Sequence, residues 1–277
     1  MRLSILSALL ILVALLSAGC GKPAPPTLAT SGGTVLTYKI VQELPDVSAA
    51  ELQNRIAARI KGDCFFDHAT VQVANGVVRI ELPGGDLQKV DRIKEMLRIP
   101  GQLSLNVVAH PGDDQQLFEA AAESDERLVT APDGRRGIWT RCAADLTFDP
   151  EWVREIDGER SCLLLLQKGN IEGPHFADFT LSLDPNGQHA LNFSMTDEGA
   201  RRLQYLTKSY QGRQLAIVFD HQVISAPVIR STISKYGMVT GNFSKEEVTK
   251  LLRTGKLAIF GELPPLELTS EEKLDPQ

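Results

Sequence analysis

Few side chains of this sequence have the types and spacing that catalysis requires. Asp67 and His68 are adjacent, as in half of an acid–base pair, but a solvated loop is the better interpretation. Asp113 and Asp114 offer carboxylates to a cation, yet no EF-hand spacing accompanies them. Ser225 precedes an Ala-Pro pair, which indicates a kink between two short strands rather than a nucleophile. These positions therefore predict neither a catalytic site nor a metal site.

Motifs that mark active sites are also missing. The sequence contains no H-E-x-x-H, G-x-S-x-G, phosphate-binding loop or dinucleotide fingerprint. Ser270–Lys273 fits S-x-x-K only formally, because it lies in a charged tail. The histidines are scattered, at His68, His110, His175, His189 and His221. We therefore expect no enzyme activity, no cofactor and no metal. A deep pocket with converging ionisable groups of perturbed pKa would instead favour a hydrolase or another enzyme.

The clearest chemical signal is at the N-terminus. Arg2 supplies a positive charge, and Ile5–Ala18 is an uncharged, mostly apolar run. A bilayer-spanning helix needs ~20 residues, so this run fits the hydrophobic region of a signal peptide better. Because Leu-Ser-Ala-Gly directly precedes Cys20, the segment resembles the lipobox of bacterial lipoproteins. The resemblance implies that residues 1–19 are removed and that Cys20 is acylated. The alternative is an ordinary secretory signal with an incidental cysteine.

Lipidation at Cys20 implies a protein of the cell envelope. Acyl chains stabilise membrane attachment by ~0.8 kcal/mol per buried CH₂ group. Residues 20–33 contain several prolines and glycines and no apolar periodicity, so we expect a flexible tether. The chain is therefore expected to be anchored to a membrane by lipid and to face the periplasmic or extracytoplasmic side.

Three further cysteines remain, namely Cys64, Cys142 and Cys162. An odd number leaves at least one thiol free or in an intermolecular bond. A disulfide between Cys142 and Cys162 is the most plausible pairing. The sequence has no C-x-x-C motif, so nothing supports a redox motif or a structural zinc site.

Composition narrows the function classes. The 277 residues are 43% hydrophobic and 23% charged, which is typical of a globular protein. Lys and Arg number 29 against 35 Asp and Glu, which gives a net charge of −6. A nucleic-acid-binding protein usually carries a basic surplus or a basic patch, so no nucleic-acid partner is expected. A mean hydropathy of −0.09 excludes a polytopic membrane protein.

The elements that position these residues begin with a strand, a helix and a hairpin. Val35–Val41 is rich in β-branched and aromatic residues and predicts a strand. Ser48 begins a capping-box pattern, and the apolar stripe after it predicts a helix that ends at Gly62. Asn75 and Gly76 lie between two alternating runs and predict a hairpin, because both residue types tolerate positive φ.

A second helix and a fourth strand complete this unit. The helix is expected after Asp86, and the alternation over Leu103–Val107 predicts the strand. The order β-α-β-β-α-β over residues 34–109 is that of a ferredoxin-like domain, with two helices on one face of a four-stranded antiparallel sheet. We therefore expect an α+β protein whose first domain is ferredoxin-like.

The remainder predicts a connector and a second α+β subdomain. Residues 110–162 are charged and irregular and are interpreted as a connector with short elements. Residues 163–268 alternate strand and helix patterns, with Thr196 and Ser244 as helix caps, and predict a mainly antiparallel sheet with helices. Residues 269–277 are interpreted as a loose tail.

Short words in this second subdomain resemble a known family. They are Ala190–Phe193, Glu198–Ala200, Leu215–Asp220 (LAIVFD), Val223–Ile229 (VISAPVI), Gly241–Phe243 and Glu246-Glu247, together with Glu81–Gly84 in the first unit. In this order and spacing they are similar to the first periplasmic domain of the SecD protein-export family, with its base and head. The resemblance covers roughly residues 34–109 and 163–268.

The resemblance implies a function that composition does not. It implies a non-catalytic accessory of protein export that binds polypeptide, with Sec translocon components or emerging secreted polypeptides as partners. The alternative is an envelope scaffold or adaptor that keeps the fold without an export role. Two features depart from the family. A lipobox stands where SecD has its first transmembrane helix, and the turn after Phe219 is Asp220-His221 rather than the usual Asp-Gly or Asp-Asn.

Overall fold

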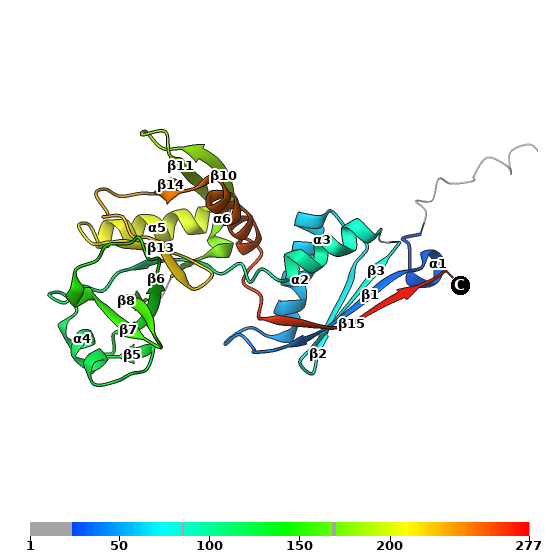
Figure 1. The fold of residues 1–277 in the computed structure, drawn as a ribbon, viewed down its shortest axis with the longest axis horizontal. Coiled ribbons are helices and arrows are strands. Elements are labelled where there is room, and N and C mark those ends of the chain that lie inside the picture. Colours follow the sequence, from blue (N-terminus) through cyan, green and yellow to red (C-terminus); the bar gives the residue numbers. More distant parts are fainter. Residues whose placement is uncertain (1–23, 85, 168–169, 277) are drawn as a thin grey trace, which may run out of the picture.

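The computed structural model describes residues 24–84, 86–167 and 170–276, which form two lobes (Figure 1). We call the lobe that holds both ends of the described chain the base, and the other lobe the head. The chain passes from base to head through residues 98–102 and returns through residues 259–265, and we call these the crossing segments. None of the described helices is long and apolar enough to cross a bilayer. The predicted lipidation site, Cys20, lies outside the described residues.

The base is a four-stranded antiparallel sheet with two helices. Its strand order is β15-β1-β3-β2, which is the ferredoxin-like arrangement. The helices and strands share one apolar core. The elements are β1 (Gly33–Ile40), α2 (Ala49–Cys64), β2 (Thr70–Ala74), β3 (Val77–Pro83), α3 (Leu87–Leu97) and β15 (Leu266–Leu274).

Local signals in the base act as predicted. The Ser48 side chain accepts a 3.2 Å hydrogen bond from the backbone N–H of Glu51 and so caps α2. The Asp86 carboxylate accepts from Lys89 N at 2.8 Å and caps α3 in the same way. Asn75 and Gly76 adopt φ of 53° and 73°, which closes the tight hairpin between β2 and β3.

The fourth strand of the base sheet corrects the sequence-based expectation. Leu103–Val107 does form a strand, β4, but it pairs with β12 (Leu215–Phe219) in the head. Its predicted place beside β1 is taken by β15, most of which was expected to be a loose tail. The apolar alternation of β4 specifies a half-buried strand but not its partner. The charged residues of β15 suit an exposed edge strand. Because they lack the apolar alternation that predicts a strand, the sequence did not indicate β15.

Two other predicted segments are more ordered than expected. In the predicted tether, Leu28–Ser31 forms the short helix α1, which Thr27 caps, and β1 already begins at Gly33. Residues 110–162 are not a connector, because they supply strands to the largest sheet of the head. Their elements are α4 (Gln115–Ala122), β5 (Leu128–Thr130), β6 (Arg136–Cys142), η1 (Pro150–Trp152), β7 (Val153–Ile156) and the first half of β8 (Glu159–Leu166).

The largest sheet of the head joins segments that are far apart in sequence. Its order is β7-β8-β6-β13-β12-β4-β9, with β5 paired to the side of β6. The β13–β6 pair is parallel and the other named pairs are antiparallel. The strands not yet given bounds are β9 (Ile171–Glu172) and β13 (Gln222–Ser225).

A three-stranded antiparallel sheet and two helices complete the head. The sheet order is β10-β11-β14. Phe176, Phe179 and Phe193 pack together in a core that both helices and one face of the largest sheet share. The elements are η2 (Gly173–His175), β10 (Phe176–Leu183), β11 (His189–Met195), α5 (Asp197–Ser209), β14 (Tyr236–Phe243) and α6 (Lys245–Ala258). The predicted α+β class with a mainly antiparallel sheet is therefore confirmed.

Candidate functional site

A cleft of about 880 Å³ lies between the base and the head. One face of the largest head sheet forms its floor, through residues of β4, β6, β8 and β12. The base contributes the loop Leu44–Val47 and Arg55, and the returning crossing segment contributes Gly261 and Glu262. A volume of this size lies within the range of ~300–1,000 Å³ that is typical of ligand pockets. The cleft is therefore the leading candidate for a binding site.

A row of hydrogen-bonded polar side chains runs along the cleft floor. Gln102, Ser104 and Asn106 alternate with the buried apolar residues of β4, and all three line the cleft. The Gln102 Nε2 donates to Ser104 Oγ at 3.2 Å, and Ser104 Oγ donates to Asn106 Oδ1 at 2.8 Å. The Asn106 Nδ2 donates in turn to the backbone oxygen of Leu165 at 3.5 Å. We call these three side chains the polar row.

The turn between β12 and β13 closes one end of the polar row. Asp220 and His221 both have positive φ, of 45° and 62°, as the sequence predicts for a turn at this position. The His221 backbone N–H donates to Gln102 Oε1 at 3.0 Å, and the His221 ring lies 3.2 Å from Glu262 Oε1. The hydrogen bond that the His221 ring donates to the Glu262 carboxylate raises the pKa of His221 above its usual value, although burial opposes the shift.

The part of the cleft formed by β6 and β8 carries a compensated set of charges. Glu159 lies between Arg127, at 3.1 Å, and Arg141, at 3.5 Å. Arg141 also donates to the backbone oxygen of Asp220 at 3.2 Å. Arg127 also pairs with Asp157 at 2.9 Å, so two carboxylates match the two guanidinium groups, and this side of the cleft does not select strongly for a charged ligand.

The chemistry of the cleft suits binding. Ser104 donates its hydroxyl hydrogen to an amide oxygen rather than to a base, so nothing in the polar row activates it as a nucleophile. Hydroxyl and amide groups both donate and accept hydrogen bonds, as peptide groups do. Within the described ranges, no set of three His, Cys, Asp or Glu side chains is arranged to hold a metal ion.

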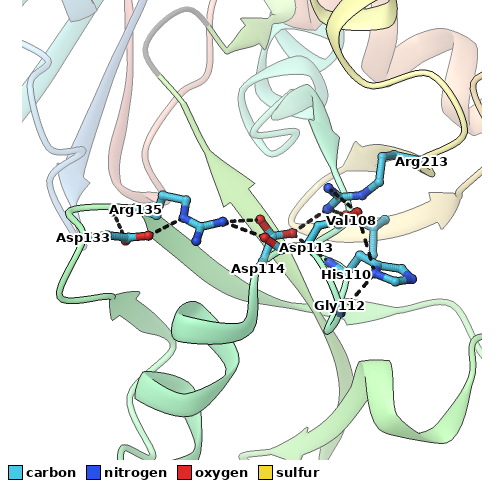
Figure 2. Close-up of polar contacts among 8 residues, drawn as sticks. All are labelled: Val108, His110, Gly112, Asp113, Asp114, Asp133, Arg135 and Arg213. Carbon is cyan, nitrogen blue, oxygen red and sulfur yellow. Dashed lines mark hydrogen bonds and ion pairs between the residues drawn. The ribbon is translucent and has the colours of Figure 1, made fainter.

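The paired aspartates Asp113 and Asp114 lie outside the cleft and bind arginines (Figure 2). The buried Asp114 carboxylate accepts from Arg135 at 2.9 Å and from Arg213 at 2.6 Å. It also accepts from the backbone N–H of His110 at 2.9 Å. Figure 2 shows this carboxylate between the two guanidinium groups. The pair thus ties the start of α4 to the segment before β12, which is a structural role.

The other positions weighed as chemical candidates also make structural contacts. Asp67 is exposed and lies 3.8 Å from Lys61. The buried Ser225 hydroxyl donates to the backbone oxygen of Thr240 at 3.0 Å. Ser270 lies in β15, where its hydroxyl donates to Glu272 at 3.3 Å. Asp67, Ser225 and Ser270 thus make separate contacts and do not form a common site.

The cysteines Cys142 and Cys162 lie close together as free thiols. They are near neighbours on β6 and β8, since Thr140 pairs with Cys162, and they belong to one apolar cluster. Their contact lowers the pKa of Cys142 and raises that of Cys162. Burial raises the pKa of the third thiol, Cys64, to about 11. The predicted disulfide remains a prediction.

Sequence reasoning missed the polar row, although a signal was present. The alternation over Leu103–Val107 predicted a strand from its apolar residues, and the polar residues between them were not interpreted. The polar half, Gln102, Ser104 and Asn106, is uncharged throughout, which is unusual for a face expected to meet solvent. Such a face indicates a position where a strand borders a sheltered cleft rather than open solvent.

Comparison with known proteins finds similarity to SecD proteins. Residues 150–259 match the family model of the SecDF P1 head subdomain. The protein translocase subunit SecD of Aquifex aeolicus is 29% identical over 244 residues, which are 87% of this chain and 42% of that protein. The SecD subunit of Rickettsia prowazekii is 33% identical over 118 residues, which are 41% of this chain and 22% of that protein. This chain thus spans less than half the length of these curated relatives.

Solved structures share the fold. A crystal structure of SecDF in its super-membrane-facing form superposes on 89% of this chain and 31% of its own, with a TM-score of 0.54 and 20% identity. A second structure, of a membrane component SecDF that enhances protein export, covers 85% of this chain and 98% of its own, with a TM-score of 0.52 and 19% identity. The match to the SecDF P1 head subdomain over residues 150–259 and the fold shared with these structures agree with the resemblance to the first periplasmic domain of SecD that the sequence words predict.

Proposed function

We propose that this chain is a lipid-anchored, extracytoplasmic SecD-like accessory of protein export that binds emerging polypeptide in the cleft, without catalysis. Its curated relatives are protein translocase subunits, and a structural neighbour enhances protein export. Sec translocon components are therefore the expected partners. The lipobox at Cys20 supports attachment to the membrane by acyl chains.

The observation that carries this proposal is the polar row on the cleft floor. A protein that handles many exported chains must bind them without reading their sequence. Peptide groups are the feature that all such chains share, and each carries one donor and one acceptor. The polar row presents donors and acceptors along a strand, with the neighbouring aliphatic side chains Val218 and Leu164 in the same cleft. Such a surface suits an extended chain of varied sequence.

Site-specific photo-crosslinking in cells tests the proposal. A benzophenone side chain replaces Thr140, which lines the cleft but lies outside the polar row. The control places the same group at the exposed Gln72 in β2 of the base. We expect crosslinks to secreted polypeptides from position 140, and none from position 72, while export is under way.

Two outcomes would contradict the proposal. Equal crosslinking from both positions would show that contact is not specific to the cleft. Crosslinks to envelope proteins alone, with none to secreted chains or translocon subunits, would support the scaffold alternative instead. Both results are read by mass spectrometry of the crosslinked products.

The anchor is tested separately at Cys20. Mass spectrometry of the mature N-terminus is expected to find an acylated Cys20, and Cys20→Ala is expected to remove the lipid and leave an uncleaved or freely soluble chain. A mature start at another residue, without lipid, would refute the anchor but leave polypeptide binding untouched.

A further inference from the structure

The strand β10 forms one edge of the three-stranded sheet of the head (Figure 1). On its inner side, Asp178–Leu183 pair with β11 in regular antiparallel register. On its outer side, the same stretch makes no backbone–backbone hydrogen bond with any residue that the structure describes. A free edge of this kind presents unpaired N–H and C=O groups, which are able to pair with another strand.

Several other edge strands of the chain carry features by which proteins block such pairing. β15 is rich in charged residues, β7 is four residues long and half charged, and β9 is two residues long. β2 is uncharged, but its two valines are buried or partly buried. From Phe179 to Leu183, β10 reads FTLSL, which contains no charge, no proline and no register shift. The edge of β10 is therefore unprotected.

Apolar side chains are exposed along the same stretch. Phe179 is buried against α6, where a Cβ at Gly255 would lie 3.1 Å from its ring. Leu181 and Leu183 follow on the same face of the strand, because side chains alternate between the two faces. These two leucines remain 49% and 57% exposed. The apolar stripe of β10 is therefore covered at Phe179 and open beyond it.

The opposite face of the sheet is hollowed beside this edge. A depression of about 530 Å³ is lined by Thr180 of β10 and by residues of β11 and β14. Tyr236 and Met238 of β14 are exposed in it. A strand added to β10 would place every second side chain on the face of this depression, and the others on the face of Leu181 and Leu183.

Charge does not restrict what the edge of β10 binds. Asp178 is the one charged residue of this strand. Its carboxylate lies 3.9 Å from Lys256 Nζ of α6, and both side chains are about half exposed. An added strand therefore needs no particular charge, and its main chain supplies the groups that the edge lacks.

We infer that the free edge of β10 binds extended polypeptide by strand addition, as a second contact on the head outside the cleft. The occupant is an unfolded segment that matches Asp178–Leu183 in length and carries apolar side chains at alternate positions, which pack on Leu181 and Leu183. Main-chain hydrogen bonds give such a contact an affinity that depends little on sequence. The inference rests on the proposed function for one point, that the segment belongs to an exported chain.

Amide hydrogen exchange on the full chain tests strand addition. The probe is a peptide of alternating valine and threonine, because both residue types favour extended structure and only valine is fully apolar. Successive residues of a strand direct their N–H groups to opposite edges, so an added strand protects every second amide. We expect alternate amides of Asp178–Leu183 to exchange about tenfold more slowly with the probe, measured by nuclear magnetic resonance. Unchanged exchange of β10 at saturating probe overturns the inference.

Matched variants separate pairing at this edge from other contacts. Leu181→Lys places on the edge the kind of charge that blocks strand pairing, and we expect probe affinity to fall by roughly tenfold in fluorescence anisotropy. Leu268→Lys makes the same change at a 40% exposed position of the edge strand β15 and should leave affinity unchanged. Ser182→Ala removes no main-chain group and should also have no effect. Equal losses in the two lysine variants overturn the inference. If Leu181→Lys does not fold, Leu183→Lys replaces it.

The remaining outcomes distinguish this inference from its alternatives. If β10 is protected before the probe is added, in a chain that light scattering shows to be dimeric, the occupant is a second copy and the inference is overturned. Crosslinks from position 140 to secreted chains, without protection of β10 by the probe, overturn the inference and leave the proposed function standing. Protection of β10 by the probe, without crosslinks from position 140 in cells, supports strand addition and refutes the proposed binding in the cleft.

Discussion

The Asp114 carboxylate accepts a 2.6 Å hydrogen bond from Arg213, which lies 99 residues further along the chain. Only 5% of the Asp114 side chain is exposed, so this pair is sheltered from solvent. Arg135 shares the same carboxylate (Figure 2). A single acidic side chain thus connects the start of α4, the loop before β6 and the segment before β12. This connection is a contact on which the head depends for its stability.

Removing this carboxylate is expected to destabilise the head. Asp114→Ala leaves Arg213, which is largely buried, with the more exposed Asp113 at 3.3 Å as its remaining carboxylate partner. We expect a loss of about 2–4 kcal/mol in the free energy of unfolding. Urea denaturation followed by circular dichroism measures the change. The matched control is Asp133→Ala, which removes an exposed partner of Arg135 and should leave the midpoint unchanged. Equal midpoints for Asp114→Ala and the unsubstituted chain would contradict the assigned role.

Breaking the polar row is expected to weaken polypeptide binding. Ser104→Ala removes the hydroxyl that joins Gln102 to Asn106, and one such hydrogen bond contributes about 0.5–1.5 kcal/mol. We therefore expect the affinity for an extended, unfolded polypeptide to fall by roughly threefold to tenfold, measured by fluorescence anisotropy. Ser182→Ala on β10, away from the cleft, serves as the control. A loss of affinity that is the same in both variants would place the binding elsewhere.

The contact between His221 and Glu262 is expected to depend on pH. Glu262 raises the pKa of His221 in the folded chain. In the unfolded chain the pKa of His221 is about 6.5, and below that pH the contact contributes its full stabilisation to the folded state. This contribution is lost as the pH rises through the higher pKa that His221 has in the folded chain. Histidine proton shifts in nuclear magnetic resonance spectra report the titration. Glu262→Gln should lower the pKa of His221, and Glu272→Gln in β15 should not. An unchanged titration in Glu262→Gln would show that the contact does not form.

The Cys142–Cys162 disulfide is expected to form when the chain is exported to an oxidising compartment. The two thiols lie diagonally across antiparallel strands, since Thr140 rather than Cys142 is directly opposite Cys162, and the strands must adjust for the bond to form. The bond would close a short loop, and by the chain-entropy model this adds about 3 kcal/mol to the free energy of unfolding. Mass spectrometry of peptides from the envelope fraction, with and without reductant, checks the bond. The bond is absent if alkylation labels both residues before reduction. Cys64 should be labelled without reduction once the chain is unfolded.

The sequence predicted the local structure well because local structure depends on nearby residues. Thr196 caps α5 through Gly199 N at 3.1 Å, and Ser244 caps α6 through Glu247 N at 3.2 Å, both as predicted. The Asp220-His221 turn has the positive φ values that its position between two strands requires. The two caps are made by contacts between residues three positions apart, whereas the Asp220-His221 turn also bonds the distant Gln102.

Strand partners were less accessible to sequence reasoning. The alternation over Leu103–Val107 identified a strand, but two sheets could have accepted it. β4 pairs with β12 because Leu103, Leu105 and Val107 then enter the larger core of the head. The strand that pairs with β1 in the base is instead β15, whose charged sequence has no apolar alternation that would predict a strand.

By itself, the sequence determined the caps, the turns, the two α+β units and the family words, because these depend on short-range spacing and on residue identity. Only the tertiary structure decided that Arg59 lies between two crossing segments, that the polar row borders a cleft and that Asp114 meets Arg213. Those contacts join residues 40 to more than 200 positions apart, and their partners are backbone carbonyls or ordinary charged side chains. Such partners carry no sequence signal, since every residue offers a carbonyl and many offer a charge.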